Sequence, residues 1–180
     1  VNERIKARTG RDLIVAILIS LAIGGALILS LVFFKWGFVL FALAAALLGT
    51  FEFGRALVTA GRKVDIILQL VAGTVLVLSG FFLDLWLHWV VVFAMVALVV
   101  VWRLVGQMIA ADGRTYGAVL GDVLTAGFIQ LYVPFLASLT LVLLRQENGE
   151  WWVLAFIIVV VAADTGAYAS GVMFGRTPMA

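Results

Sequence analysis

Six apolar runs, separated by short polar segments, restrict this chain more than any other feature of its sequence. They cover residues 13–34, 36–51, 66–82, 86–102, 123–144 and 151–175. A helix of about 20 residues rises about 30 Å, which is the thickness of the hydrocarbon core of a bilayer. Apolar residues make up 65% of the chain and charged residues 12%, whereas soluble domains carry about 25% charged residues. The pattern predicts an all-α, polytopic membrane protein in which residues 1–180 form a single transmembrane domain of about six helices.

The placement of positive charges predicts how these helices are oriented. If the N-terminus is cytoplasmic, ten of the 12 Lys and Arg residues fall in cytoplasmic segments, and only Lys35 and Arg145 fall outside. This bias follows the positive-inside rule, so we expect both ends of the chain in the cytoplasm. The first run is longer than the apolar core of a signal peptide, which has about 7 to 15 residues, and is interpreted as an uncleaved span. Because the cations form no extended patch, no nucleic-acid partner is expected.

Several kinds of site are excluded by residues that the sequence lacks. There is no cysteine and only one histidine, His88, which excludes thiolate and multi-histidine metal sites. No phosphate-binding loop, dinucleotide fingerprint or serine nucleophile motif occurs. All six tryptophans lie at the ends of apolar runs, where they are expected to anchor the helices at the membrane surface. His88, between Trp86 and Trp89, is interpreted as another interfacial residue without a partner.

Asp164 is the first candidate functional residue, because it is the only charged residue in the run 151–175. An aspartate near the middle of a membrane helix costs about 2.5 to 3.5 kcal/mol, and such residues usually serve a polar cavity, a substrate path or an ion. Asp164 lies about 20 Å from the outer end of the run, in the cytoplasmic half of the bilayer. Tyr168 and Gly171 follow on the same face, so a lipid headgroup or a metal could meet this stripe. The structural alternative is that Asp164 pairs with a buried arginine or caps a local helix break at Thr165.

Four further polar residues are candidates for lining a cavity. Gln130 and Tyr132 lie close to Pro134, whose missing N–H leaves a backbone carbonyl that a side chain or water must satisfy. We expect a kink there, which either opens a cavity or serves helix packing. Glu52 and Arg55 lie three residues apart at the cytoplasmic end of the second run and can approach each other. They either line the same cavity or form a solvated ion pair.

Two other features are interpreted as structural. Asp112, Arg114 and Asp122 lie between the fourth and fifth runs and predict a solvated cytoplasmic loop with an acidic helix start. Gly117 and Gly121 have the spacing that lets membrane helices approach each other closely.

The segment 161–168, with the sequence VAADTGAY, is followed by Phe174-Gly175-Arg176 and resembles the phosphatidate cytidylyltransferases, also called CDP-diacylglycerol synthases. Weaker similarity to this family lies in FEFGR at 51–55 and in LYVP at 131–134. The resemblance therefore extends along most of the chain. The lysine-rich loop and the aspartate-bearing signature that follow in the family do not occur here. The resemblance thus implies the N-terminal two thirds of such a protein, lacking the C-terminal catalytic signature region.

Members of the family transfer a cytidylyl group from CTP to phosphatidate, in a magnesium-dependent reaction that makes CDP-diacylglycerol and pyrophosphate for phospholipid biosynthesis. For this chain the resemblance implies a nucleotidyltransferase with CTP and phosphatidate as substrates, surrounded by lipids in a bacterial inner membrane. It implies that Asp164 is the catalytic residue and a candidate Mg²⁺ ligand, with the main ligands beyond Ala180. It also implies that Thr165, Tyr168 and Arg176 bind substrate. A homodimer is left open.

A small multispan transporter or channel is the alternative function. Such a protein could keep an acid at Asp164 and use the kinked fifth run as a route for protons or cations. A membrane scaffold without chemistry is a third alternative. A polar cavity alone would suit both an enzyme and a transporter, and the resemblance favours the enzyme.

Overall fold

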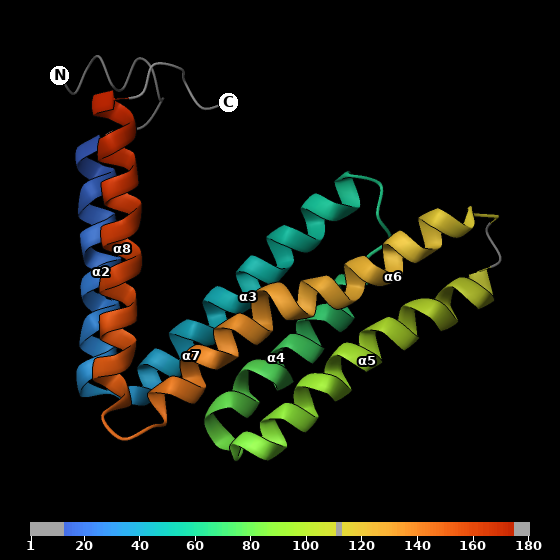
Figure 1. The fold of residues 1–180 in the computed structure, drawn as a ribbon, viewed down its shortest axis with the longest axis horizontal. Helices are drawn as coiled ribbons and strands as arrows, with labels where there is room; N and C mark the ends of the chain where they lie inside the picture. Colours follow the sequence, from blue (N-terminus) through green and yellow to red (C-terminus); the bar gives the residue numbers. More distant parts are fainter. Residues whose placement is uncertain (1–12, 111–112, 175–180) are drawn as a thin grey trace. The chain divides into compact units, whose positions relative to one another are not determined.

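The computed structural model describes residues 13–110 and 113–174, and every regular element in these ranges is a helix (Figure 1). The elements in chain order are α2 (Leu13–Phe33), α3 (Lys35–Thr59), α4 (Ile66–Phe82), α5 (Leu85–Ala110), α6 (Tyr116–Gln130), the π-helix η1 (Leu131–Phe135), α7 (Leu136–Leu144) and α8 (Gly149–Phe174). Because α6, η1 and α7 follow one another without a gap, they form one long rod.

The described helices confirm the predicted fold class. Four of them are long and apolar enough to cross a membrane: α3, α5, the α6–η1–α7 rod and the part Gly149–Tyr168 of α8. Shorter apolar helices are α4 and the part Ala22–Phe33 of α2. The chain is therefore an all-α, polytopic membrane protein. The number of six spans and the cytoplasmic location of both ends stay predictions.

Three helices extend beyond the apolar runs that predicted them. α3 continues to Thr59, α5 continues to Ala110, and α6 begins at Tyr116. The added residues contain no proline, so backbone hydrogen bonding continues past the last apolar residue of each run. The predicted loop between the fourth and fifth runs is therefore wrong for Asp122, which lies within α6 and is fully buried.

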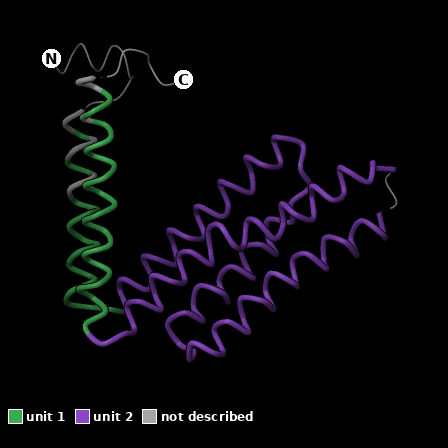
Figure 2. The backbone as a smooth tube through the Cα atoms, viewed as in Figure 1, with its two compact units in different colours: residues 1–35, 148–180 green, residues 36–147 purple. Residues whose placement is uncertain are grey.

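The chain divides into two compact units (Figure 2): residues 1–35 with 148–180, and residues 36–147. In the described part of the first unit, α2 packs against α8. Lys35 Nζ and Glu150 Oε2 lie 2.8 Å apart and add an ion pair to this unit. In the second unit, α4 packs against α5, α6, η1 and α7. That residues 1–180 form a single domain stays a prediction.

Two glycines let α4 approach the proline-containing rod closely. A Cβ atom at Gly73 would lie 3.0 Å from Pro134 Cγ, and one at Gly80 would lie 2.5 Å from the carbonyl oxygen of Ser138. Pro134 lies in η1, where the wider hydrogen-bond spacing of a π-helix accommodates a residue without an N–H. At Pro134, where a kink was expected, the structure has a π-helical turn that packs against α4.

His88 is not an interfacial residue, and the prediction that it lacks a partner is wrong. It lies in the first turn of α5 and is fully buried. Its Nδ1 atom lies 2.8 Å from Ser79 Oγ, and its Nε2 atom lies 3.4 Å from Ser138 Oγ. Since α4, α5 and α7 each contribute one of these residues, His88 is a polar junction between three helices. The flanking Trp86 and Trp89 are exposed as expected.

Candidate functional site

Asp164, Thr165 and Tyr168 lie on α8 and are all exposed. Asp164 and Tyr168 share a helix face, one turn apart. Asp164 forms no hydrogen bond or ion pair with another described residue, so the alternative of a buried arginine partner finds no support there. The alternative of a helix break at Thr165 is wrong, because α8 is continuous over Gly149–Phe174. Arg176 lies outside the described residues.

Gln130 belongs to a packed helix interface. Its Nε2 atom donates hydrogen bonds to the backbone oxygen and to Oε1 of Gln69, at 2.8 and 2.7 Å. Gln69 in turn donates through Nε2 to the carbonyl oxygen of Ala126 at 3.1 Å. Tyr132 is exposed, and its ring stacks on that of Phe128 with 5.2 Å between the centroids. For Gln130, these contacts favour the packing alternative over a cavity.

Glu52 and Arg55 are exposed on α3 and do not form the ion pair that was one of the two alternatives for them. The guanidinium of Arg55 instead lies 5.6 Å from the ring centroid of Phe51, one helical turn earlier. An arginine over an aromatic face gains a cation–π interaction without fixing a second charged side chain. Neither residue lines the cavity described below.

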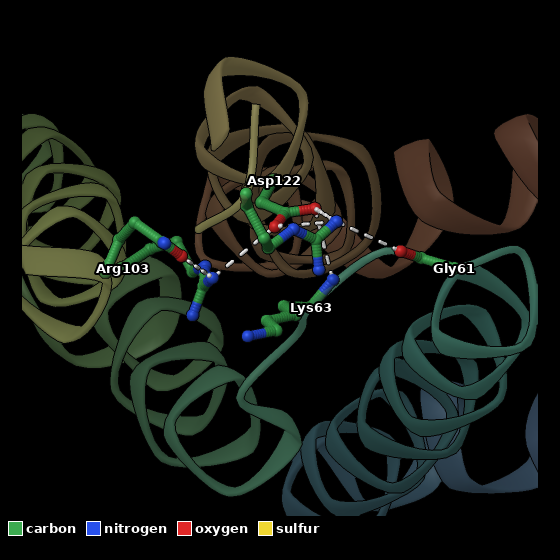
Figure 3. Close-up of polar contacts among 6 residues, drawn as sticks. Gly61, Lys63, Arg103 and Asp122 are labelled. Carbon is green, nitrogen blue, oxygen red and sulfur yellow. Dashed lines mark hydrogen bonds and ion pairs between the residues drawn. The ribbon is translucent and has the colours of Figure 1, made fainter. Parts of the chain in front are cut away.

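A buried cluster of charges surrounds Asp122, and sequence reasoning missed it (Figure 3). Oδ2 of Asp122 lies 3.4 Å from Nη2 of Arg103 and also 3.4 Å from Nη2 of Arg114. Oδ1 accepts a hydrogen bond of 3.2 Å from the backbone N–H of Lys63. Arg114 also donates to the carbonyl oxygen of Gly61 at 3.3 Å. Because the Asp122 side chain has 0% exposure, two guanidinium groups rather than water balance its charge.

The cluster joins three segments that are distant in sequence. Arg103 comes from α5, Arg114 from the turn before α6, and Lys63 from the connection between α3 and α4. Gly61 and Gly113 adopt positive φ angles of 85° and 66°, which glycine allows at no steric cost and which shape the two connections.

A signal for this cluster was present in the sequence. Asp122, Ala126 and Gln130 are spaced four residues apart, so they share one face of α6, and all three are buried. The predicted apolar run begins at residue 123 and so excludes Asp122 from the helix face to which it belongs.

A cavity of about 660 Å³ lies beside the cluster and shares Lys63 and Arg103 with it. Its lining combines cationic, acidic and aliphatic side chains: Val58, Arg62, Lys63, Val64, Asp65, Ile66, Ile67 and Arg103. The carboxylate of Asp65 is already engaged, because Oδ1 accepts from the backbone N–H of Leu68 at 3.2 Å and Oδ2 accepts from Trp102 Nε1 at 2.9 Å. The cavity therefore offers positive charge next to aliphatic surface.

Comparison with known proteins identifies the family. The model of the cytidylyltransferase family matches residues 14–180. The chain belongs to this family. The match confirms the resemblance found in VAADTGAY and does not favour a transporter or channel. No solved structure matches the chain significantly.

Mycobacterial proteins are similar to this member of the cytidylyltransferase family. Proteins named phosphatidate cytidylyltransferase from Mycobacterium bovis and Mycobacterium tuberculosis are 37% identical to it over 186 residues. The protein of that name from Mycobacterium leprae is 31% identical over 191 residues. Each similarity covers 96% of this chain, but only 58%, 54% and 58% of the respective relative. The chain thus spans little more than half the length of these relatives.

The described residues do not by themselves form the magnesium site that the family resemblance implies. Within residues 13–110 and 113–174, no group of three or more His, Cys, Asp or Glu side chains could hold a metal ion. Asp122 is occupied by Arg103 and Arg114. Asp164 is available, but it would supply only one of the several oxygen ligands that Mg²⁺ requires.

Proposed function

We propose that this protein transfers the cytidylyl group of CTP to phosphatidate, giving CDP-diacylglycerol and pyrophosphate. The observation that carries this proposal is 37% identity, over 96% of the chain, to proteins named phosphatidate cytidylyltransferase. The apolar helices support it, because a lipid substrate has to be met within or at the surface of the membrane.

In the proposed reaction, a phosphate oxygen of phosphatidate forms a bond to the α-phosphorus of CTP, and the bond to the pyrophosphate leaving group breaks. Phosphoryl transfer of this kind depends mainly on positioning the reactants and on neutralising negative charge. A carboxylate cannot donate to phosphate oxygens, so we infer that Asp164 orients a cationic group beside them. The hydroxyl groups of Thr165 and Tyr168, and the guanidinium of Arg176, would contact phosphate oxygens directly. The exposed, unpaired side chain of Asp164 supports this role.

Magnesium belongs to the proposal on the strength of the family resemblance. When bound, it would supply positive charge next to the phosphates. Asp164 would give it one carboxylate, and the other ligands would come from outside the described residues. None of the roles inferred above for Thr165, Tyr168 and Arg176 depends on the ion.

We infer that the protein lies in a bacterial inner membrane with its N-terminus in the cytoplasm. The distribution of Lys and Arg residues supports this orientation, and the mycobacterial relatives support the location. A homodimer stays a prediction, since the structure describes one chain.

The proposal is tested by assaying the intact protein in membranes from cells that lack their own activity. We expect label from CTP in a lipid product only when phosphatidate is present, together with stoichiometric pyrophosphate. ATP in place of CTP, and phosphatidylcholine in place of phosphatidate, should give no product. Product formation independent of phosphatidate would contradict the proposed function.

A further inference from the structure

The cavity beside Asp122 contains arginine N–H groups that are not engaged. Arg103 uses Nη2 for Gln107 Oε1 at 2.9 Å and for Asp122 Oδ2 at 3.4 Å. Its Nη1 atom has no hydrogen-bond partner among the described residues and can serve as a donor, whereas its Nε atom is buried and not accessible to a ligand. The side chain of Arg62 is exposed and forms no hydrogen bond or ion pair with a described residue. Since guanidinium groups are strong donors to phosphate oxygens, the cavity can bind a phosphate.

Gly121 on α6 positions Arg62 at this cavity. The guanidinium of Arg62 lies where a Cβ atom of residue 121 would be, so any larger residue would displace it. Gly121 therefore does more than provide the helix-packing spacing seen in the sequence, because it leaves room for a cation from the α3–α4 connection. Gly117, its partner in that spacing, has no atom within 4 Å of a Cβ position.

Positive charge exceeds negative charge around the cavity. Among the described residues of the cavity and the adjoining cluster, three arginines face two carboxylates, which leaves one positive charge: Arg62, Arg103 and Arg114 against Asp65 and Asp122. A phosphate monoester carries about 1.5 to 2 negative charges near neutral pH. The excess charge thus suits a phosphate group and opposes a cationic ligand.

The other half of the lining indicates that the phosphate belongs to a lipid. Four of the eight lining residues are aliphatic: Val58, Val64, Ile66 and Ile67. Trp102, which donates its indole N–H to Asp65 in the cavity wall, is 55% exposed. Tryptophans that combine an exposed ring with a satisfied N–H are typical of the headgroup level of a membrane. The cavity therefore joins a charged surface to an apolar one at the depth where phospholipid headgroups lie.

We propose that this cavity binds the phosphate headgroup of an anionic phospholipid, with Arg62 and Arg103 as donors to the phosphate and the aliphatic residues against the first carbons of the acyl chains. The site lies entirely within residues 58–103 of the second unit. It does not depend on the transfer reaction proposed above, because it requires neither CTP nor Asp164.

The test measures binding of dioctanoyl phosphatidylglycerol, which is not a substrate of the proposed reaction, to the purified full protein by calorimetry, without CTP. Arg62→Gln is expected to weaken the binding of this lipid by at least about tenfold, which is the value of one charge-assisted hydrogen bond. Arg55→Gln is the matched control, since it removes the same guanidinium from an exposed position on α3 that does not line the cavity. We expect it to leave lipid binding unchanged. The unfolding midpoints of both variants should equal that of the parent.

A second variant and two soluble ligands complete the test. Gly121→Leu should reproduce the loss with every charge in place, because its side chain occupies the position of the Arg62 guanidinium. Glycerol 3-phosphate and inorganic phosphate should bind at least about tenfold more weakly than phosphatidylglycerol, because they bury no acyl carbons. Equal losses from Arg62→Gln and Arg55→Gln, or no loss from either, would overturn the site. Soluble phosphate binding as tightly as lipid would overturn the choice of a lipid.

Discussion

Asp122 and Asp164 are both aspartates in apolar helices, yet they differ in exposure and in the partners of their carboxylates. Asp122 is fully buried in the second unit and meets two arginines and a backbone N–H. Asp164 is exposed on α8 in the first unit and meets no described partner. A buried carboxylate with all its charge paired is poorly placed to bind a ligand, whereas an exposed and unpaired one is free to do so.

The comparison shows that an acid in an apolar segment does not identify a functional site by itself. The cost of removing the charge from water is met inside the protein at Asp122, because Arg103 and Arg114 are held beside it. At Asp164 no described side chain meets that cost. We therefore assign Asp122 to stability and to the positioning of Arg103, and Asp164 to the proposed chemistry.

The largest effect is expected at the buried aspartate. Asp122→Asn should destabilise the protein by about 3 kcal/mol, because it leaves two arginines beside a neutral group. The arginine side chains are 16% and 22% exposed, which limits the loss, since water partly solvates them. Urea unfolding in mild detergent, followed by circular dichroism, measures the change. A variant as stable as the parent would show that the cluster does not hold the second unit together.

Asp164→Asn is expected to lower activity while leaving stability almost unchanged. Activity should fall about 100-fold, equivalent to about 2.7 kcal/mol of transition-state stabilisation, while the free energy of unfolding changes by less than about 0.5 kcal/mol. The matched control is Asp84→Asn, at an exposed aspartate between α4 and α5, which should keep full activity. Undiminished conversion of phosphatidate by Asp164→Asn, at normal membrane abundance, would remove this residue from the mechanism.

Glycine-to-alanine substitutions in α4 and α2 measure how closely the helices pack within each of the two units. A Cβ atom at Gly80 would lie 2.5 Å from a backbone oxygen in α7, so Gly80→Ala must move one helix and should cost about 2 kcal/mol. At Gly24 in α2 nothing lies within 4 Å of the Cβ position, so Gly24→Ala should be neutral or stabilise by up to about 1 kcal/mol. The same unfolding measurement applies to both. A large loss from Gly24→Ala would show that α2 is packed more closely than the described contacts indicate.

The sequence predicted the helices well because their signal is local. Apolar runs of membrane length predicted the end of α2 to within one residue, and α4 matched its run from Ile66 to Phe82. The family was likewise predicted from the contiguous segment around Asp164. Helix ends were less accurate, since a helix can continue into water after its apolar face has ended.

Contacts between distant residues could not be predicted in the same way. The partners of Asp122 come from α5 and from the connections before α4 and α6, and the partners of His88 come from α4 and α7. No periodicity within one segment reveals such pairings. Local spacing was also misleading for Arg55, because both Glu52 and Phe51 lie within its reach and the structure places it over the ring.

The smallest expected effect is at the buried glutamines, and it compares the stabilisation by neutral polar side chains with that by the paired charges of Asp122. Gln69 and Gln130 are neutral and fully buried between α4 and α6, joined by hydrogen bonds of 2.8 and 2.7 Å. Gln130→Leu should cost only about 1 kcal/mol, because hydrogen bonds between membrane helices contribute about 0.6 kcal/mol on average, and Oε1 of Gln130 already lacks a partner. A double-mutant cycle with Gln69→Leu, measured by urea unfolding, should give a coupling energy of similar size.

A coupling energy between the two glutamines as large as the loss from Asp122→Asn would mean that buried polar side chains in general, rather than the paired charge, stabilise the second unit. A coupling near zero would mean that apolar packing at Gly73 and Gly80 holds α4 in place without help from the amides.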